Sequence, residues 1–172
     1  LNGTDGNDRI EGSTDPFGRF EDGYDIITGG KGDDVLIGGP AKSSVGGCIA
    51  DIYRFGDDSG NDIIVGFTLS LSGYSGCGVV DRIEIPFGIN GSDIQTATDL
   101  INSSSNNSAG YAVLNLGSGN TVTLDGVALE DIQLQSIHIL PDMDRLIQGT
   151  AEANVLNGTD GNDRIEGSTD PF

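Results

Sequence analysis

The sequence has few of the residues on which most catalytic sites depend. It contains no Trp, one His and two Cys, and aromatic residues make up 6% of its 172 positions. A Ser-His-Asp triad or a Cys-His pair needs a histidine next to its nucleophile. The single histidine, His138, lies in a segment of alternating polar and apolar residues, which is typical of a strand with an exposed imidazole. We therefore expect no enzyme activity from this chain.

Basic residues and long apolar runs are also scarce. The chain has 8 Lys and Arg against 27 Asp and Glu, a formal net charge of −19. Nucleic acids and anionic membranes both bind basic surfaces, so neither is expected as a partner. No apolar run approaches the ~18 residues that a membrane-spanning helix requires, so membrane insertion is not expected either. So acidic a chain should resist compaction unless cations neutralise it.

Glycine is abundant, and the glycines recur with aspartate at fixed spacing. There are 28 Gly in the chain. Residues 3–11 and 29–37 follow the nine-residue pattern G-G-x-G-x-D-x-U-x, where U is apolar, and Asp25, Asp51 and Asp62 precede apolar pairs in looser copies. Six residues of each unit should form a turn, and the last three a short strand. The apolar eighth position should face the interior, and it is occupied by Ile10, Ile27, Leu36, Tyr53 and Ile64.

Stacked turns of this composition predict calcium sites. Ca²⁺ prefers six to eight oxygen ligands at roughly 2.3–2.6 Å, and turn carbonyls together with the aspartate at position six supply such oxygens. We expect several Ca²⁺ ions. Asn154 lacks the charge of an aspartate, so its turn should be a weak or empty end site. The expected ligand-bearing residues are Thr4, Gly6, Asp8, Asp22, Asp25, Gly30, Gly32, Asp34, Asp51, Asp62, Asn154 and Asp163.

A much longer repeat encloses the short one. The first seventeen residues, LNGTDGNDRIEGSTDPF, recur without change at residues 156–172, which sets a period of 155 residues. The identity indicates one full module of a tandem array followed by the start of the next, residues 141–172. A fragment with overlapping ends is the alternative, and it too requires a repeating parent. Neighbouring copies are therefore expected partners, joined covalently or assembled as a fibre.

Residues 1–67 and 148–172 resemble the RTX (repeats-in-toxin) family of secreted bacterial proteins. Residues 62–67 and 81–85 resemble the family's usual exit from the roll. Residues 119–127 do so too, and they resemble the β-rich segment that follows the roll in RTX proteases and in the non-catalytic modules of alginate epimerases. The resemblance implies an all-β fold in which a calcium-binding parallel β-roll precedes a β-rich capping segment. It also implies type I secretion, folding in extracellular calcium, and a location outside the cell or on its surface.

The remaining segments complete the expected fold. Residues 1–67 form the roll, and residues 68–140 form a β-rich segment packed on it. Ser92 and Gln95 should form the capping box of one short helix, residues 111–116 and 121–127 a hairpin, and residues 133–140 a strand. Apolar outward positions should be covered by residues 79–140 or by a neighbouring module. These outward positions are Ile26, Val35, Ile37, Ile52, Ile63 and Val65.

The two cysteines, Cys48 and Cys77, are expected to form one disulfide because an exported chain meets oxidising conditions. A pair of buried thiols is the alternative.

Three functions fit these observations. The first is a structural repeat module of a large extracellular protein: an adhesin, a surface-layer protein or a matrix filament of a biofilm. The second is a non-catalytic carbohydrate-binding module of a secreted enzyme such as an alginate epimerase, with polysaccharide as its partner. The third, the secretion domain of a toxin, fits the nonapeptides but not the exact 155-residue period. The first is favoured.

Overall fold

The computed structural model describes residues 1–12, 25–39, 50–69, 80–141, 146–148 and 164–166. Contacts divide the chain into two compact units, Leu1–Ile139 and Leu140–Phe172. Within the described residues, no helix is long and apolar enough to cross a membrane. The two cysteines, Asp22, Asn154 and Asp163 lie outside the described residues, so their expected roles remain predictions.

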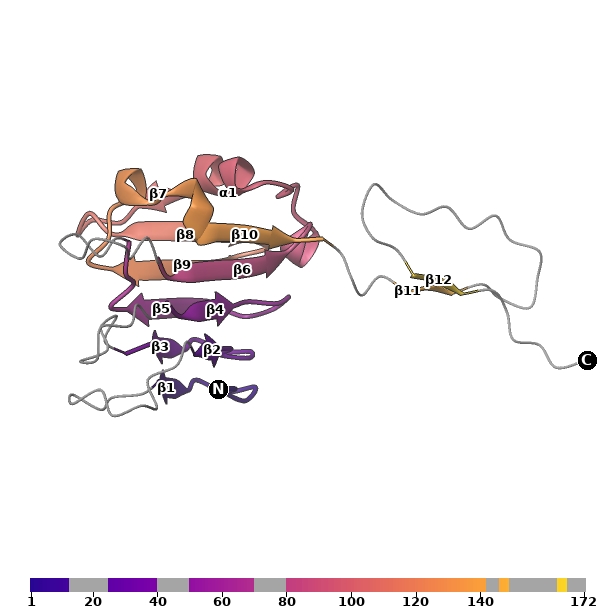
Figure 1. Ribbon diagram of the computed structural model, residues 1–172, viewed down its shortest axis with the longest axis horizontal. Coiled ribbons are helices and arrows are strands. Elements are labelled where there is room, and N and C mark those ends of the chain that lie inside the picture. The colour runs from indigo at the N-terminus through magenta and orange to yellow at the C-terminus, as the bar shows by residue number, and fades with distance from the viewer. Residues whose placement is uncertain (13–24, 40–49, 70–79, 142–145, 149–163, 167–172) are drawn as a thin grey trace, which may run out of the picture. The chain divides into compact units, whose positions relative to one another are not determined.

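The first unit is built from two sheets, and as far as residue 86 successive strands belong alternately to one and the other (Figure 1). The six-stranded sheet has the order β1-β3-β5-β9-β8-β7, and the four-stranded sheet has the order β10-β6-β4-β2. The roll strands are β1 (Arg9–Glu11), β2 (Ile26–Ile27), β3 (Val35–Ile37), β4 (Ile52–Arg54), β5 (Asn61–Val65) and β6 (Arg82–Pro86). The later strands are β7 (Ser105–Asn106), β8 (Ala112–Gly117), β9 (Asn120–Asp125) and β10 (Ile137–Leu140).

The parallel strands stack in register, one coil of chain above the next. Ile10 pairs with Leu36, and Leu36 with Ile64. Leu36 and Ile64 are 0% exposed, as are Ile27 and Tyr53 in the facing sheet, whereas Ile10 at the end of the stack is partly buried. The expectation that position eight faces inward is therefore confirmed. Burial of each apolar side chain of this size contributes about 1.5–3 kcal/mol to the free energy of unfolding.

The chain after the roll continues the same two sheets. Strand β6 pairs in parallel with β4, and β9 pairs in parallel with β5. The expected hairpin is present as β8 and β9, which are antiparallel. A β-rich fold with one short α-helix is thus confirmed among the described residues, but the six-stranded sheet is mixed. The expectation of a purely parallel roll is corrected accordingly, because β9 joins the antiparallel strands β8 and β7 to the parallel ones.

The one α-helix of the described chain, α1 (Ala97–Ser103), begins at a different cap from the expected one. Thr96 is the N-cap: its hydroxyl accepts from the Asp99 N–H at 3.2 Å, and the Asp99 carboxylate accepts from the Thr96 N–H at 2.8 Å. Ser92 lies in an earlier turn, where its hydroxyl accepts from the Ile94 N–H at 3.3 Å. The capping box of Ser92 and Gln95 was therefore wrong, because two such boxes overlap in this sequence and the second has the stronger, charged acceptor.

Three short 3₁₀ turns complete the unit. They are η1 (Ile89–Gly91), η2 (Leu129–Asp131) and η3 (Leu134–Ser136). The last replaces the first half of the strand expected over residues 133–140, so only β10 remains extended. In β10, Ile137 is buried and His138 is exposed, as the alternation predicted.

The outward positions of the roll are covered less than expected. Ile26 and Ile63 are 38% and 39% exposed. Ile52 is buried, and the remaining outward positions are intermediate, namely Val35, Ile37 and Val65. Residues 79–140 were expected to lie over this face, but β6 and β9 instead extend the sheets edge to edge. Edge pairing satisfies backbone N–H and C=O groups that a layer of side chains would leave unbonded. Cover by a neighbouring module remains a prediction.

The second unit contains β11 (Leu146–Gln148) and β12 (Arg164–Glu166). They pair in parallel, with Leu146 opposite Arg164, Ile147 opposite Ile165 and Gln148 opposite Glu166. The partners are 18 residues apart, which is two nonapeptides without an insertion. In the first unit, the equivalent steps between stacked aspartates are 26, 28 and 30 residues. Insertions between its nonapeptides account for the difference.

Candidate calcium-binding turns

Three turns stack along the six-stranded sheet, and their last residues form an aspartate ladder. We call Asp8, Asp34 and Asp62 the first ladder. The Asp8 N–H donates to Asp34 Oδ1 at 2.8 Å, and the Asp34 N–H donates to Asp62 Oδ1 at 2.9 Å. Each carboxylate therefore uses one oxygen to hold the preceding coil. The aspartates at position six of successive turns thus form a column of carboxylates along the sheet.

A second ladder runs along the four-stranded sheet and consists of Asp25, Asp51 and Asp81. The Asp25 N–H donates to Asp51 Oδ1 at 2.9 Å, and the Asp51 N–H donates to Asp81 Oδ1 at 2.8 Å. Asp81 was not among the expected ligand residues. Its place two residues before the buried Ile83 repeats the aspartate-to-apolar spacing of the nonapeptide, and this signal could have identified it. The other oxygen of Asp81 accepts from the Thr68 N–H at 2.8 Å.

The glycines of the first stack let the turns approach one another closely. Gly30 and Gly32 have φ of 105° and 119°, in the left-handed region that side chains rarely adopt. A Cβ on Gly30 would overlap the Thr4 carbonyl oxygen, and one on Gly32 would lie 2.9 Å from the Gly6 carbonyl oxygen. The stacking therefore brings Thr4 to Gly30 and Gly6 to Gly32, the same residues from which the sequence predicted carbonyl ligands.

Two carboxylate oxygens in the first ladder are buried without a hydrogen-bond partner. They are Oδ2 of Asp34 and Oδ2 of Asp62, and both residues are 1% exposed. An unpaired buried carboxylate is costly unless a cation or a proton neutralises it. Asp8 differs, because its Oδ2 accepts from the Thr4 N–H at 2.6 Å and from the Thr4 hydroxyl at 2.9 Å. The unbonded oxygens thus lie inside the stack, where a cation would offset the greatest desolvation cost.

The electrostatics of both ladders favour a cation or a proton. Burial raises the pKa of Asp62 from 3.8 to about 7, with Asp34 and Asp33 adding repulsion. Burial also raises the pKa of Asp51 to about 6, helped by the charges of Asp81 and Asp25. The pKa of Asp81 is raised for the same first cause. These carboxylates therefore bear negative charge in surroundings that disfavour it.

The donor set fits Ca²⁺ bound mainly by backbone oxygen. In the part of the chain that the structure describes, no group of three or more His, Cys, Asp or Glu side chains is placed to hold a metal ion. A turn stack offers one aspartate per turn, and Ca²⁺ accepts backbone carbonyls readily. Carbonyls at Thr4, Gly6 and Gly32, together with the unbonded ladder oxygens, are ligands of the right kind.

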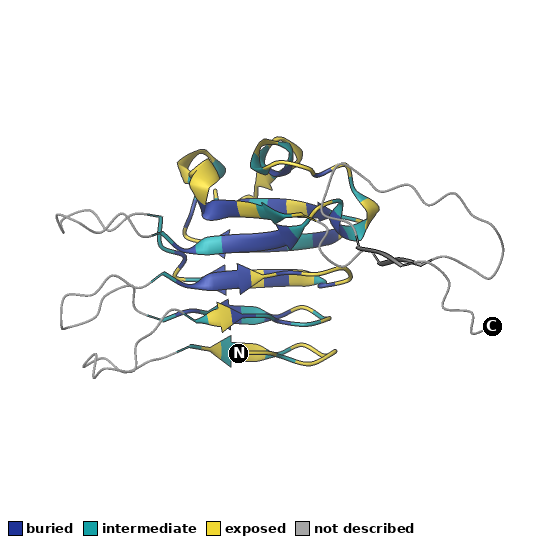
Figure 2. Ribbon diagram, turned by 45° about the vertical axis from the view of Figure 1, so that its right-hand side comes forward, coloured by how far each residue is buried: buried dark blue, intermediate teal, exposed yellow. Residues whose placement is uncertain are grey.

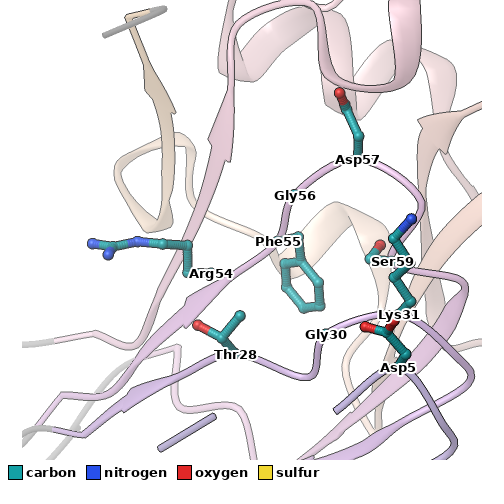
Figure 3. A pocket seen from close by; sticks show the side chains of 9 residues that line it. All are labelled: Asp5, Thr28, Gly30, Lys31, Arg54, Phe55, Gly56, Asp57 and Ser59. Atoms are coloured by element: carbon teal, nitrogen blue, oxygen red, sulfur yellow. The ribbon is translucent and has the colours of Figure 1, made fainter. Parts of the chain in front are cut away.

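A pocket of about 190 Å³ opens beside the turn stack (Figure 3). Phe55 points into it, Gly30 and Gly56 line it, and Ser59 contributes a hydroxyl that is buried without a hydrogen-bond partner. Its remaining lining carries both charges, from Asp5, Lys31, Arg54 and Asp57, together with Thr28. The cationic groups make this pocket a poorer place for Ca²⁺ than the ladders.

The described chain combines short parallel strands, glycine turns and aspartate ladders. Together these features define a nonapeptide repeat protein of the calcium-binding class. The family comparison agrees: residues 1–15, 21–40 and 146–170 match the RTX calcium-binding nonapeptide repeat, in four copies. The chain therefore carries RTX calcium-binding nonapeptide repeats.

Two further comparisons add little to this assignment. No curated protein matches the sequence. Among solved structures, the chain is similar to the extracellular lipase LipA from Serratia marcescens, with a TM-score of 0.42 and 23% identity, over 79% of this chain and 20% of the lipase. The chain thus spans about a fifth of that enzyme's length.

Without calcium, the folded chain should be more stable in acid than in base. Asp62 and Asp51 have folded pKa values of about 7 and about 6, above the ordinary 3.8, so the folded state holds protons that the unfolded state has released. In chelator, the melting temperature should therefore fall as the pH rises from about 5 to about 8. Thermal melts across this range measure it, and Asp62→Asn should flatten the profile. An equal or rising melting temperature toward pH 8 would contradict the prediction.

Proposed function

We propose that this chain is a calcium-dependent structural repeat module of a large extracellular protein, of the adhesin, surface-layer or matrix-fibre type. The observation that carries the proposal is the stack of glycine turns with buried, unbonded carboxylate oxygens at Asp34 and Asp62. The match to RTX calcium-binding repeats and the exact 155-residue period support it. Several Ca²⁺ ions take part, and the module itself is non-catalytic.

Each part of the turn has its own task in this proposal. Calcium, when bound, would supply the positive charge that the buried carboxylates lack. Glycine at positions 30 and 32 permits the close approach of neighbouring coils. Thr4, Gly6, Gly30 and Gly32 would supply carbonyl oxygen to the ion, and the ladder aspartates would add carboxylate oxygen. The ladder residues that fill this role are Asp8, Asp34 and Asp62 in one stack, and Asp25, Asp51 and Asp81 in the other.

Calcium dependence also suits a secreted protein. In low cytosolic calcium the 27 acidic residues repel one another and keep the chain unfolded for export. Extracellular modules bind calcium with a Kd of about 10⁻⁴–10⁻³ M, so the chain folds once it meets millimolar calcium outside the cell. The coupling of folding to secretion follows from the RTX repeats and remains part of the proposal.

A carbohydrate-binding role is the alternative, and among the described aromatic residues it has one exposed ring, Phe87, which is 43% exposed. Sugar-binding modules present exposed aromatic rings, but Tyr53 is 0% exposed and packs against Phe67 with ring centroids 5.9 Å apart. Tyr111 is intermediate in exposure, and Tyr24 and Tyr74 lie outside the described residues. The structural role is therefore preferred.

The proposal predicts that two successive periods behave as one stiff body in calcium. A chain of residues 1–155 followed by residues 1–172 should show one common rotational correlation time by NMR relaxation in millimolar calcium. The same chain in chelator should lose this behaviour. Affinity electrophoresis in alginate serves as the parallel measurement. Independent tumbling of the two copies, or saturable retardation by alginate in place of stiffness, would favour the carbohydrate-binding alternative.

A further inference from the structure

Among the described residues, the six-stranded sheet ends at β1, with no further strand outside it. Strand β1 is the last strand in the sheet order, and it pairs on one side with β3. Its central Ile10 is partly buried, whereas the stacked Leu36 and Ile64 are 0% exposed. Leu1, which hydrogen-bonds to Ile26 and Thr28 at the start of the same coil, is 51% exposed. Figure 2 shows that the coil carrying the N-terminus is mostly exposed, in contrast to the buried strands of the middle coils.

The first aspartate ladder also stops at this edge. Asp34 Oδ1 and Asp62 Oδ1 each accept the backbone N–H of the aspartate one coil earlier. Asp8 offers the same oxygen, but among the hydrogen bonds of the described residues its Oδ1 has no donor, since Thr4 bonds to Oδ2. A further strand outside β1 would bring a backbone N–H to this position. The edge is thus shaped for one more coil of the same kind.

The chain contains a copy of this edge with its additional strand in place. Residues 156–172 repeat residues 1–17, so β12 (Arg164–Glu166) has the sequence of β1 (Arg9–Glu11). Strand β12 pairs in parallel with β11, Leu146–Gln148. The same three residues, Arg-Ile-Glu, therefore accept the segment 146–148 as a neighbouring strand in β12.

We infer that the open edge of β1 is a docking edge for residues 146–148 of a second copy of this chain. The register transfers directly from β12: Leu146 opposite Arg9, Ile147 opposite Ile10 and Gln148 opposite Glu11. The inference rests on the proposed function in one respect, that copies of the module act together.

This contact is the addition of a strand to an exposed sheet edge, in which main-chain hydrogen bonds give the affinity. It joins two different surfaces of the same molecule, so it does not close on itself and it propagates in one direction. Ile10 becomes buried, and the six-stranded sheet continues from one copy into the next. Docking also explains how an exposed edge, ordinarily a site of uncontrolled association, is given a specific partner.

Within each chain, β12 already pairs with β11. The experiment must therefore first free β11 from β12. Ile165→Pro removes a backbone donor from the middle of β12 and should release β11. The donor chain carries Gln148→Cys with Ile165→Pro, and the acceptor chain carries Glu11→Cys. Both are full-length and are mixed under mild oxidation in millimolar calcium. Peptide mass spectrometry identifies the 148–11 disulfide apart from bonds of Cys48 and Cys77.

Arg9→Cys provides the matched control acceptor. Both acceptors lose the same ion pair, since Arg9 and Glu11 bond to each other, and both positions are exposed. In the inferred register, position 9 lies two residues from the partner of Gln148, about 8 Å away and beyond the ~7 Å that a disulfide spans. We expect about fivefold or more cross-linking at position 11 over position 9, and less when Ile165 is retained.

Circular dichroism of the same samples separates the possible failures. Folding in calcium with equal cross-linking at positions 9 and 11, or with equal yields in chelator, overturns the docking edge and leaves the proposed function standing. Variants without Ile165→Pro give the same comparison if that substitution disturbs folding. Failure of the unmodified chain to fold in calcium overturns the proposed function and the docking edge together.

Discussion

Gly30→Ala should destabilise the calcium-loaded chain by about 3 kcal/mol, the combined cost of left-handed backbone and overpacking. Gly30 has a φ of 105°, and a Cβ there would overlap the Thr4 carbonyl oxygen of the preceding turn. A methyl group at this point separates two turns that must share oxygens. For a chain of this size, the loss corresponds to a fall in melting temperature of about 6–12 °C.

Gly56→Ala is the control for this substitution. Gly56 lines the pocket beside the same stack, but a Cβ there meets nothing within 4 Å. Its stability should change by less than about 0.5 kcal/mol, or rise slightly because alanine restricts the unfolded chain. Thermal melts of both variants in millimolar calcium make the comparison. Equal melting temperatures would show that the close approach of the turns does not matter for stability.

Asp34→Asn should raise the calcium concentration at the folding midpoint by about tenfold, because calcium affinity in oxygen sites follows the number of ligand charges. The amide retains an oxygen that can accept from the Asp8 N–H, so the ladder hydrogen bond survives. What disappears is the negative charge on a residue that is 1% exposed and whose Oδ2 is unbonded. In chelator the same substitution should leave the chain as stable or more stable, since it removes a buried charge.

Asp93→Asn is the matched control, because it changes the net charge equally at an exposed position outside the roll. Its calcium midpoint should remain within about twofold of the unmodified chain, because an exposed charge in solvent is screened. Calcium titrations followed by circular dichroism give both midpoints. Equal shifts for the two variants would mean that calcium acts through net charge alone, with no site at the ladder.

The nonapeptide frame predicted the roll well because it encodes short-range physics. Glycine at position 30 permits the turn, and the eighth position fixes which side chain of each strand is buried. Leu36 and Ile64 are fully buried where that frame placed them. The pairing of β11 with β12 likewise follows from two nonapeptides without an insertion.

The long-range pairing could not be predicted in the same way. The step from Asp51 to Asp81 spans 30 residues, and an insertion hides the repeat from a nine-residue frame. The parallel pairing of β9 with β5 joins residues about 60 apart, such as Thr121 and Asn61, and depends on which sheet edges remain open. The hydrogen bonds of the ladders could not be predicted either. A sequence identifies the aspartates, but it does not show which carboxylate oxygen of each one is free to bind a cation.

Calcium as the folding ligand is tested most directly by far-UV circular dichroism and thermal melting of the full chain in millimolar calcium and in EGTA. The buried, unbonded oxygens of Asp34 and Asp62 predict a β-sheet spectrum with a cooperative melt in calcium. In EGTA at neutral pH, the β signal should be lost or its melting temperature should fall sharply, and readdition of calcium should restore both. A β-sheet spectrum and a melting temperature that are the same in EGTA as in calcium would contradict it.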